Sequence, residues 1–147
     1  MRWALVLCIA ACSDSGGPTN SSDAAFCVQE TNRYRTMNSK PALTESKQLE
    51  TYADTGAMVD FNSTPHNHFS TTQGGGIAFA ENECPKWDLG AQGQGDMQKL
   101  VAACIAAFYA EGPGGGHYDN MMGNYRTLGC GIFQSGTTVT IVQDYGN

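Results

Sequence analysis

The order of the secondary-structure patterns along the chain constrains its fold more than any other feature. Helical patterns come first, over residues 25–37, 44–61 and 97–110. Two β-rich runs close the chain, residues 128–134 and 137–143, joined by Ser135-Gly136 in the manner of a tight hairpin, and residues 76–80 are a further candidate strand. Helices separated from a terminal hairpin predict an α+β fold rather than a doubly wound sheet.

The helix expected from residue 97 has the clearest apolar stripe. Asp96 can cap its N-terminus, as Asp23 can cap the first helix and Thr44 the second. The stripe continues to Glu111, where a buried carboxylate would need a partner. If the helix ends at Ala110, Glu111 can face water instead.

The N-terminus resembles an export signal. A positive start, Met1-Arg2, precedes the apolar residues 3–11. The run Ile9-Ala10-Ala11-Cys12 resembles the bacterial lipobox, in which the cysteine is acylated. We therefore expect a signal peptide at 1–11, a lipidated Cys12 with a flexible tether at 12–23, and a domain at 24–147 anchored to the bacterial cell envelope. A cleaved signal and a secreted soluble protein is the alternative.

Composition limits the classes of partner. The 147 residues suit one domain, with 41% hydrophobic and 15% charged residues. The formal net charge of −6 excludes a broad basic surface, so we expect no nucleic-acid partner. No apolar run approaches the roughly 18–20 residues that span a bilayer, so membrane contact is expected only through the lipid anchor. We expect a monomer.

Four cysteines remain in the expected mature domain: Cys27, Cys84, Cys104 and Cys130. An even number in an exported domain suggests two disulfides, for which three pairings exist. We favour Cys84–Cys104 with Cys27–Cys130. The chain has no CxxC pair, which argues against a zinc site built on thiolates.

Histidines and glutamates near polar or glycine-rich loops form the candidate site: His66, His68, Glu81, Glu111 and His117. Two imidazoles and two carboxylates are chemically sufficient to hold a divalent metal such as zinc.

Five short motifs follow one another in the order typical of a known family. They are Ala80-Glu81-Asn82, Phe108 three residues before Glu111, Gly116-His117-Tyr118, Gly129-Cys130-Gly131 and Asp144-Tyr145. From about residue 26 to the end, the chain resembles the CAP superfamily of cysteine-rich secretory proteins, antigen five and pathogenesis-related proteins. The match covers nearly the whole expected domain.

This resemblance implies a three-layer α-β-α sandwich with a central antiparallel sheet. It also implies a cleft lined by two histidines and two glutamates, which here are one of His66 and His68, together with Glu81, Glu111 and His117. We favour His68, because relatives place a small polar residue near that histidine and Ser70 is close by. The resemblance further implies zinc binding through the histidines, and a lipid or other small ligand.

Three functions remain open at this point. The first is a binding module that holds a divalent metal and a small ligand. The second is a metal-dependent hydrolase in which Glu81 or Glu111 takes a proton from a metal-bound water. The third is a structural or interaction module, in which the same polar groups form a hydrogen-bond network without a ligand.

Overall fold

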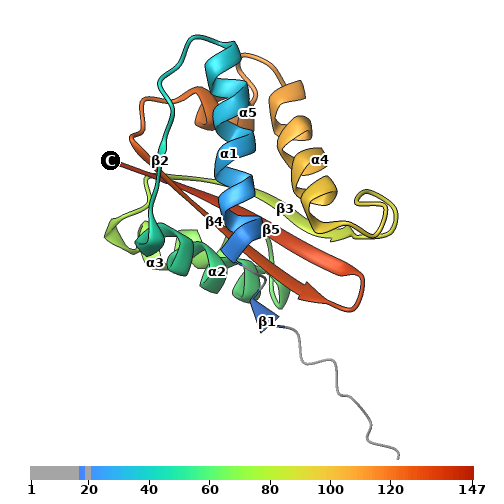
Figure 1. Ribbon diagram of the computed structural model, residues 1–147. Coiled ribbons are helices and arrows are strands. Elements are labelled where there is room, and N and C mark those ends of the chain that lie inside the picture. The colour runs from blue at the N-terminus through green and yellow to red at the C-terminus, as the bar shows by residue number, and fades with distance from the viewer. Residues whose placement is uncertain (1–16, 19–20) are drawn as a thin grey trace, which may run out of the picture.

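A computed structural model describes residues 17–18 and 21–147, and its elements stack in three layers (Figure 1). The helices are α1 (Ser21–Met37), α2 (Lys47–Phe61), α3 (Asn67–Thr72), α4 (Met97–Ala110) and α5 (Gly116–Met122), with a 3₁₀ turn, η1, at Gln73–Gly76. The strands are β1 (Gly17–Pro18), β2 (Thr44–Glu45), β3 (Ala80–Asp88), β4 (Thr127–Ser135) and β5 (Thr138–Gly146). The predicted α+β class is confirmed.

The strands form one sheet in the order β1-β4-β5-β3, so β3 is an outer strand of the described sheet. These pairings are antiparallel, and β4 and β5 form the expected terminal hairpin. The two-residue β2 pairs with β4 in parallel, which makes the sheet mixed rather than wholly antiparallel. The sheet lies between α1, α4 and α5 on one face and α2 and α3 on the other (Figure 1).

Two disulfides connect the α1/α4 layer to the sheet. Cys27–Cys130 joins α1 to β4, and Cys84–Cys104 joins β3 to α4. This is the pairing favoured from the sequence. Side chains alternate between the two faces of a strand, and Cys84 and Cys130 therefore assign one face of the sheet to α1 and α4. The residues that alternate with these two cysteines along each strand face α2 and α3 instead.

Helix α2 packs directly against the backbone of β4. A Cβ atom on Gly129 would overlap the backbone of Leu49 and Glu50, and one on Gly131 would overlap the backbone of Ala53. Neither position tolerates a side chain, and the two glycines let the helix approach the sheet closely. This contact places the C-terminal end of α2 near the site described below.

Three local predictions differ from the structure. Helix α1 begins at Ser21, inside the segment expected to be a tether, and Asp23 lies in its first turn. Helix α2 begins after Ser46, whose side chain accepts a hydrogen bond from the N–H of Leu49, because Thr44 is taken up in β2. Of the strand expected at residues 76–80, only Ala80, the first residue of β3, is in a strand; Gly76 has a positive φ of 74°, which extended backbone does not allow, and ends the 3₁₀ turn.

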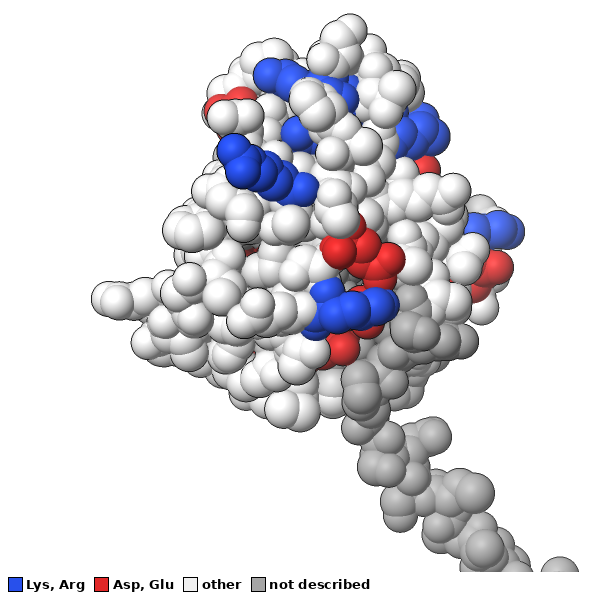
Figure 2. All heavy atoms as spheres, turned by 60° about the vertical axis from the view of Figure 1, so that its left-hand side comes forward, with Lys and Arg blue, Asp and Glu red and all other residues white. Residues whose placement is uncertain are grey.

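The expected signal peptide and Cys12 lie outside the described residues, as does most of the expected tether. In the part of the chain that the structure describes, no helix is long and apolar enough to cross a bilayer. On the face shown in Figure 2, basic and acidic side chains form small separate groups among uncharged residues.

Candidate metal centre

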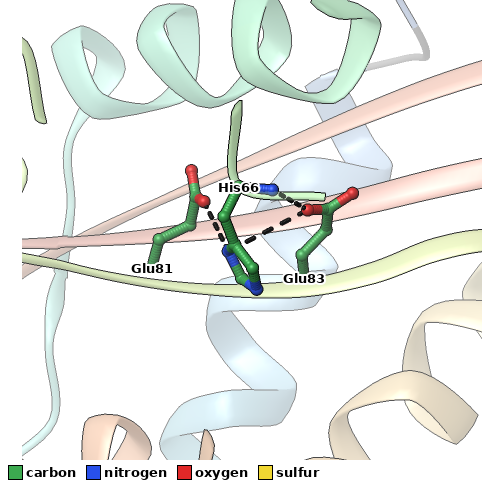
Figure 3. A group of neighbouring side chains, drawn as sticks. All are labelled: His66, Glu81 and Glu83. Atoms are coloured by element: carbon green, nitrogen blue, oxygen red, sulfur yellow. Dashed lines mark hydrogen bonds and ion pairs between the residues drawn. The ribbon is translucent and has the colours of Figure 1, made fainter. Parts of the chain in front are cut away.

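His66 lies between α2 and α3 and reaches back to β3. The residue precedes α3 in a left-handed conformation, with φ of 61°, and this turn directs its ring over the strand. Its Nδ1 lies 2.7 Å from Oε1 of Glu81 and 3.9 Å from Oε2 of Glu83 (Figure 3). Its backbone N–H also donates to Oε2 of Glu83, at 2.7 Å. The strand therefore holds this histidine through both its ring and its backbone.

Glu81 and Glu83 lie two residues apart on β3, so they project from the same face of the strand, toward α2 and α3 (Figure 3). Both are buried, with 7% and 3% of their surface exposed. One ligand atom from each of His66, Glu81 and Glu83 lies within 4.8 Å of the others. Among the described residues, no other group of three potential ligands meets this distance.

The surroundings of these three residues shift the pKa of each one, because two carboxyl groups are buried beside a single histidine. Burial raises the pKa of Glu81, and it raises the pKa of Glu83 to about 7. The hydrogen bond to Glu81 raises the pKa of His66. Oε2 of Glu81 and Oε1 of Glu83 are buried without a hydrogen-bond partner among the described residues. Two carboxylate oxygens therefore remain available to a ligand.

His68, which the sequence analysis favoured over His66 as the histidine of the cleft, does not belong to the group of three within 4.8 Å, in which His66 takes that place. Its backbone N–H donates to Oδ1 of Asp60 at 2.7 Å, which fixes the start of α3 against the end of α2. Its ring packs against Tyr52, with the ring centroids 4.5 Å apart, and its Nδ1 is buried. The left-handed turn at His66, not the nearby Ser70, decides which histidine reaches Glu81.

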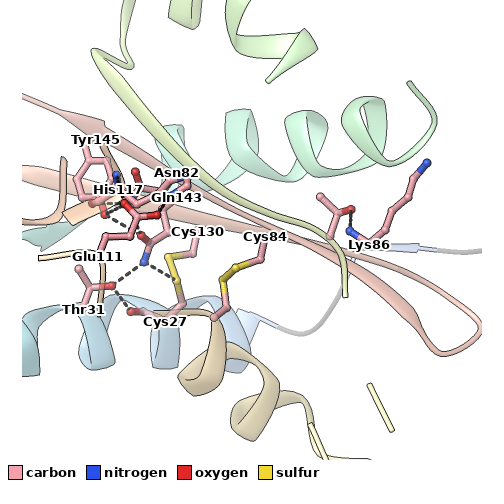
Figure 4. The surroundings of a disulfide bond; sticks show 12 residues. Cys27, Thr31, Asn82, Cys84, Lys86, Glu111, His117, Cys130, Gln143 and Tyr145 are labelled. Atoms are coloured by element: carbon pink, nitrogen blue, oxygen red, sulfur yellow. Dashed lines mark hydrogen bonds and ion pairs between the residues drawn. A yellow bond between two sulfur atoms is a disulfide. The ribbon is translucent and has the colours of Figure 1, made fainter. Parts of the chain in front are cut away.

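His117 and Glu111 form a second histidine–glutamate pair. Nδ1 of His117 is hydrogen-bonded to Oε1 of Glu111, and its backbone N–H donates to Oε2 at 3.0 Å (Figure 4). Helix α4 ends at Ala110 and Glu111 is its C-cap, so this carboxylate is exposed rather than buried on the apolar stripe. The hydrogen bond from His117 lowers the pKa of Glu111.

The two pairs approach β3 from different layers. Glu81 faces the α2/α3 layer, whereas His117 lies in α5, on the α1/α4 side. Asn82 connects them, because its side-chain amide donates to the backbone oxygen of His117 at 3.0 Å (Figure 4). Asn120 of α5 donates in turn to the backbone oxygen of Glu81 at 3.1 Å. The structure thus brings the predicted residues together as two neighbouring pairs, and only the first pair has a third ligand.

Three buried acidic residues of this region were not among the site residues expected from the sequence: Asp60, Glu83 and Asp144. Each carried a signal. Glu83 stands two residues after Glu81 on a strand, and Asp60 continues the apolar stripe of α2 four residues after Gly56. Asp144 lies in the closing strand directly opposite Glu81. The pattern that marks buried apolar residues also marked these carboxylates.

Comparison with known protein families gives a match over most of the chain. The chain matches the CAP family, described as the cysteine-rich secretory protein family, over residues 28–145. No curated protein matches the chain.

Proposed function

Because the chain belongs to the CAP family, we propose that it is an exported binding module that holds a divalent cation at His66, Glu81 and Glu83. The observation that carries this proposal is the convergence of one imidazole and two buried carboxylates, of which two oxygens have no hydrogen-bond partner within the described chain. A buried, unpartnered carboxylate is costly, and a cation offsets that cost.

The donor set indicates the kind of ion. One imidazole nitrogen and two carboxylate oxygens suit zinc, which also takes a water or ligand as its fourth partner. The same donors accept manganese. The Asp60 carboxylate, which binds the backbone of His68, supports the loop that presents His66.

His117 and Glu111 serve, in this proposal, as polar groups for a small ligand that reaches the ion across the outer edge of β3. Glu111 is exposed and His117 is partly exposed, and the hydrogen bond from Asn82 to the backbone oxygen of His117 connects this pair to β3. A lipid groove has less support. Met121 is fully buried in the core and is not open to a ligand, which leaves Phe79, 59% exposed, as an exposed apolar side chain.

The proposed location is the bacterial cell envelope. Two disulfides fit an exported protein. Acylation of Cys12 would supply the membrane contact, and the formal net charge of −6 disfavours a nucleic-acid partner. Incorporation of a labelled fatty acid into the wild-type chain, but not into Cys12→Ser, tests the anchor.

Calorimetric titration of zinc into the full chain at pH 7.5 tests the cation site. We expect saturable binding that weakens at least about tenfold in His66→Gln and in Glu83→Gln, because losing even a hydrogen-bond partner of a metal ligand typically costs about 10–100-fold in affinity. Glu111→Gln is the matched control, since Glu111 also bonds a histidine but belongs to no group of three ligands.

Two results would contradict the proposal. The first is the absence of zinc binding by a folded protein. The second is binding that Glu111→Gln weakens as much as Glu83→Gln does. Unchanged thermal stability with zinc or with a chelator, together with a large loss in His66→Gln, would instead favour a purely structural network.

A further inference from the structure

Behind the His66/Glu81/Glu83 group, three more polar side chains lie between the sheet and the α2/α3 layer: Asp60, His68 and Asp144. Asp144 is the cross-strand neighbour of Glu81, so the two side chains project from the same face of the sheet. Asp60, at the end of α2, is tied to the backbone of His68. We call Asp60, His68 and Asp144 the inner group.

The inner group contains buried atoms without partners. Asp144 is 0% exposed and neither of its carboxylate oxygens has a hydrogen-bond partner within the described chain. Asp60 is 2% exposed, and its Oδ2 is likewise unpartnered there. The same holds for Nδ1 of His68 and for Oε2 of Glu81, the oxygen that does not contact His66. Such groups are rare in folded proteins and call for a ligand or a proton.

When the four carboxyl groups of this region are all ionised, as metal ligands must be, their charge exceeds what one ion can offset. Asp60, Glu81, Glu83 and Asp144 supply four carboxylates, and no Lys or Arg of the described chain forms an ion pair with any of them. A single divalent cation at His66 offsets half of that charge. A second divalent cation would offset the remainder.

We propose that the inner group binds a second divalent cation, with Glu81 bridging the two ions. Oε1 of Glu81 then serves the outer ion beside His66, and Oε2 serves the inner ion together with Asp60, His68 and Asp144. The proposal rests on the outer site proposed above. No three of the inner side chains have ligand atoms that all lie within 4.8 Å of one another, so the proposal requires some of them to move toward the ion.

Gly56 of α2 leaves space beside the inner group. A Cβ atom at this position would lie 3.3 Å from Nδ1 of His68 and 3.9 Å from Oε2 of Glu81. Those two unpartnered atoms therefore border the same small space, which a larger residue would fill.

The inner donors specify the class of ion. Three carboxylates and one imidazole form a hard, oxygen-rich set, which suits manganese better than copper or a thiolate-seeking metal. Bridging carboxylates typically hold two ions about 3.5–4 Å apart. Manganese is therefore the appropriate probe, since it is also paramagnetic and reports a neighbouring ion directly.

The test is the stoichiometry of manganese binding to the chelator-stripped full chain at pH 7.5, measured by calorimetry and by electron paramagnetic resonance. We expect two equivalents, with spin coupling between the ions when both are bound. Asp144→Asn, which keeps the shape of the side chain, should retain one equivalent and lose the coupling. Gly56→Ala should do the same, and Thr55→Ala, an exposed neighbour on α2, should retain both equivalents.

One equivalent in the wild type, unchanged in Asp144→Asn and lost in Glu83→Gln, would overturn the second ion and leave the proposed function intact. Two equivalents that persist without change in both Asp144→Asn and Gly56→Ala would also overturn it. Failure of the proposed function gives a different result, namely no manganese or zinc bound by the folded wild-type chain.

Discussion

Glu81 on β3 and Asp144 on β5 are direct cross-strand partners, and both carboxylates are buried on the face of the sheet that α2 covers. Like charges placed opposite each other destabilise a sheet. Burial raises the pKa of Asp144 to about 9, and repulsion from Glu81 and Asp60 acts in the same direction. Two buried carboxyl groups that repel each other when ionised therefore lie next to each other at the edge of the candidate cation site.

Asp144 should make the metal-free protein less stable as the pH rises. Between the ordinary aspartate pKa and about 9, the folded state keeps a proton that the unfolded state releases. The free energy of unfolding therefore falls by up to ~1.4 kcal/mol per pH unit across this window. Asp144→Asn cannot ionise, so urea unfolding in chelator at pH 5 to 8 should show a shallower slope and higher stability at pH 8.

Asp88→Asn is the control for that measurement. Asp88 is on the same strand as Glu81, but hydrogen bonds from the Ala91 N–H and Thr137 lower its pKa. Above pH 5, Asp88 is ionised in the folded and in the unfolded protein. Asp88→Asn should therefore leave the slope of unfolding free energy against pH unchanged. A wild-type stability that is constant or rises from pH 5 to 8 would contradict the role given to Asp144.

Zinc should stabilise the protein more at pH 8 than at pH 6. Its ligands must lose their protons before the ion binds, and the pKa values of His66 and Glu83 are both raised, the latter to about 7. At a free zinc concentration of 100 times Kd, binding adds about 2.7 kcal/mol to the free energy of unfolding. Thermal unfolding with zinc or chelator checks this, and an equal rise in Tm at both pH values would refute it.

Removal of the two disulfides should have unequal effects. Cys27–Cys130 joins residues 103 apart, whereas Cys84–Cys104 joins residues 20 apart. A longer closed loop restricts the unfolded chain more. We expect the Cys27→Ala/Cys130→Ala variant to lose about 4–5 kcal/mol and the Cys84→Ala/Cys104→Ala variant about 3 kcal/mol in urea unfolding. The reverse order would show that native packing, not loop length, dominates.

Gly131→Ala should separate α2 from the sheet. Its added methyl would overlap the backbone of Ala53, which cannot move as a flexible side chain would. We expect a loss of at least about 3 kcal/mol, at the upper end of overpacking effects. Gly116→Ala is the matched control, because nothing lies within 4 Å of its Cβ position, and it should change stability by less than about 1 kcal/mol. Equal effects of the two substitutions would argue against close packing at Gly131.

The sequence predicted those helices and strands that are marked by a pattern of their own residues. The apolar stripe and Asp96 marked α4, whose N-cap does accept a hydrogen bond from the Lys99 N–H. The alternating run around Ser135-Gly136 marked the β4–β5 hairpin. The predicted N-cap of α2 was wrong. Ser46, not Thr44, caps this helix, because Thr44 pairs with β4.

The candidate site depended on contacts between segments distant in sequence. Motif order identified Glu81, Glu111 and His117 as site residues, but not which histidine reaches Glu81. The backbone turn at His66 made that choice. Asp60 was not expected in the site, and Asp144 was expected only as part of a family motif. Only contacts between elements place these carboxyl groups in the same buried region as Glu81.

The sequence by itself determined the α+β class, the resemblance to the CAP family and the expectation of two disulfides, because each depends on periodicity, motif order or cysteine number. Only the tertiary structure decided that Asp60, Glu83 and Asp144 share one buried region with His66 and His68. The physical reason is that the energy of a carboxylate depends on the solvent and charges around it, and those are established only when α2 packs onto the sheet.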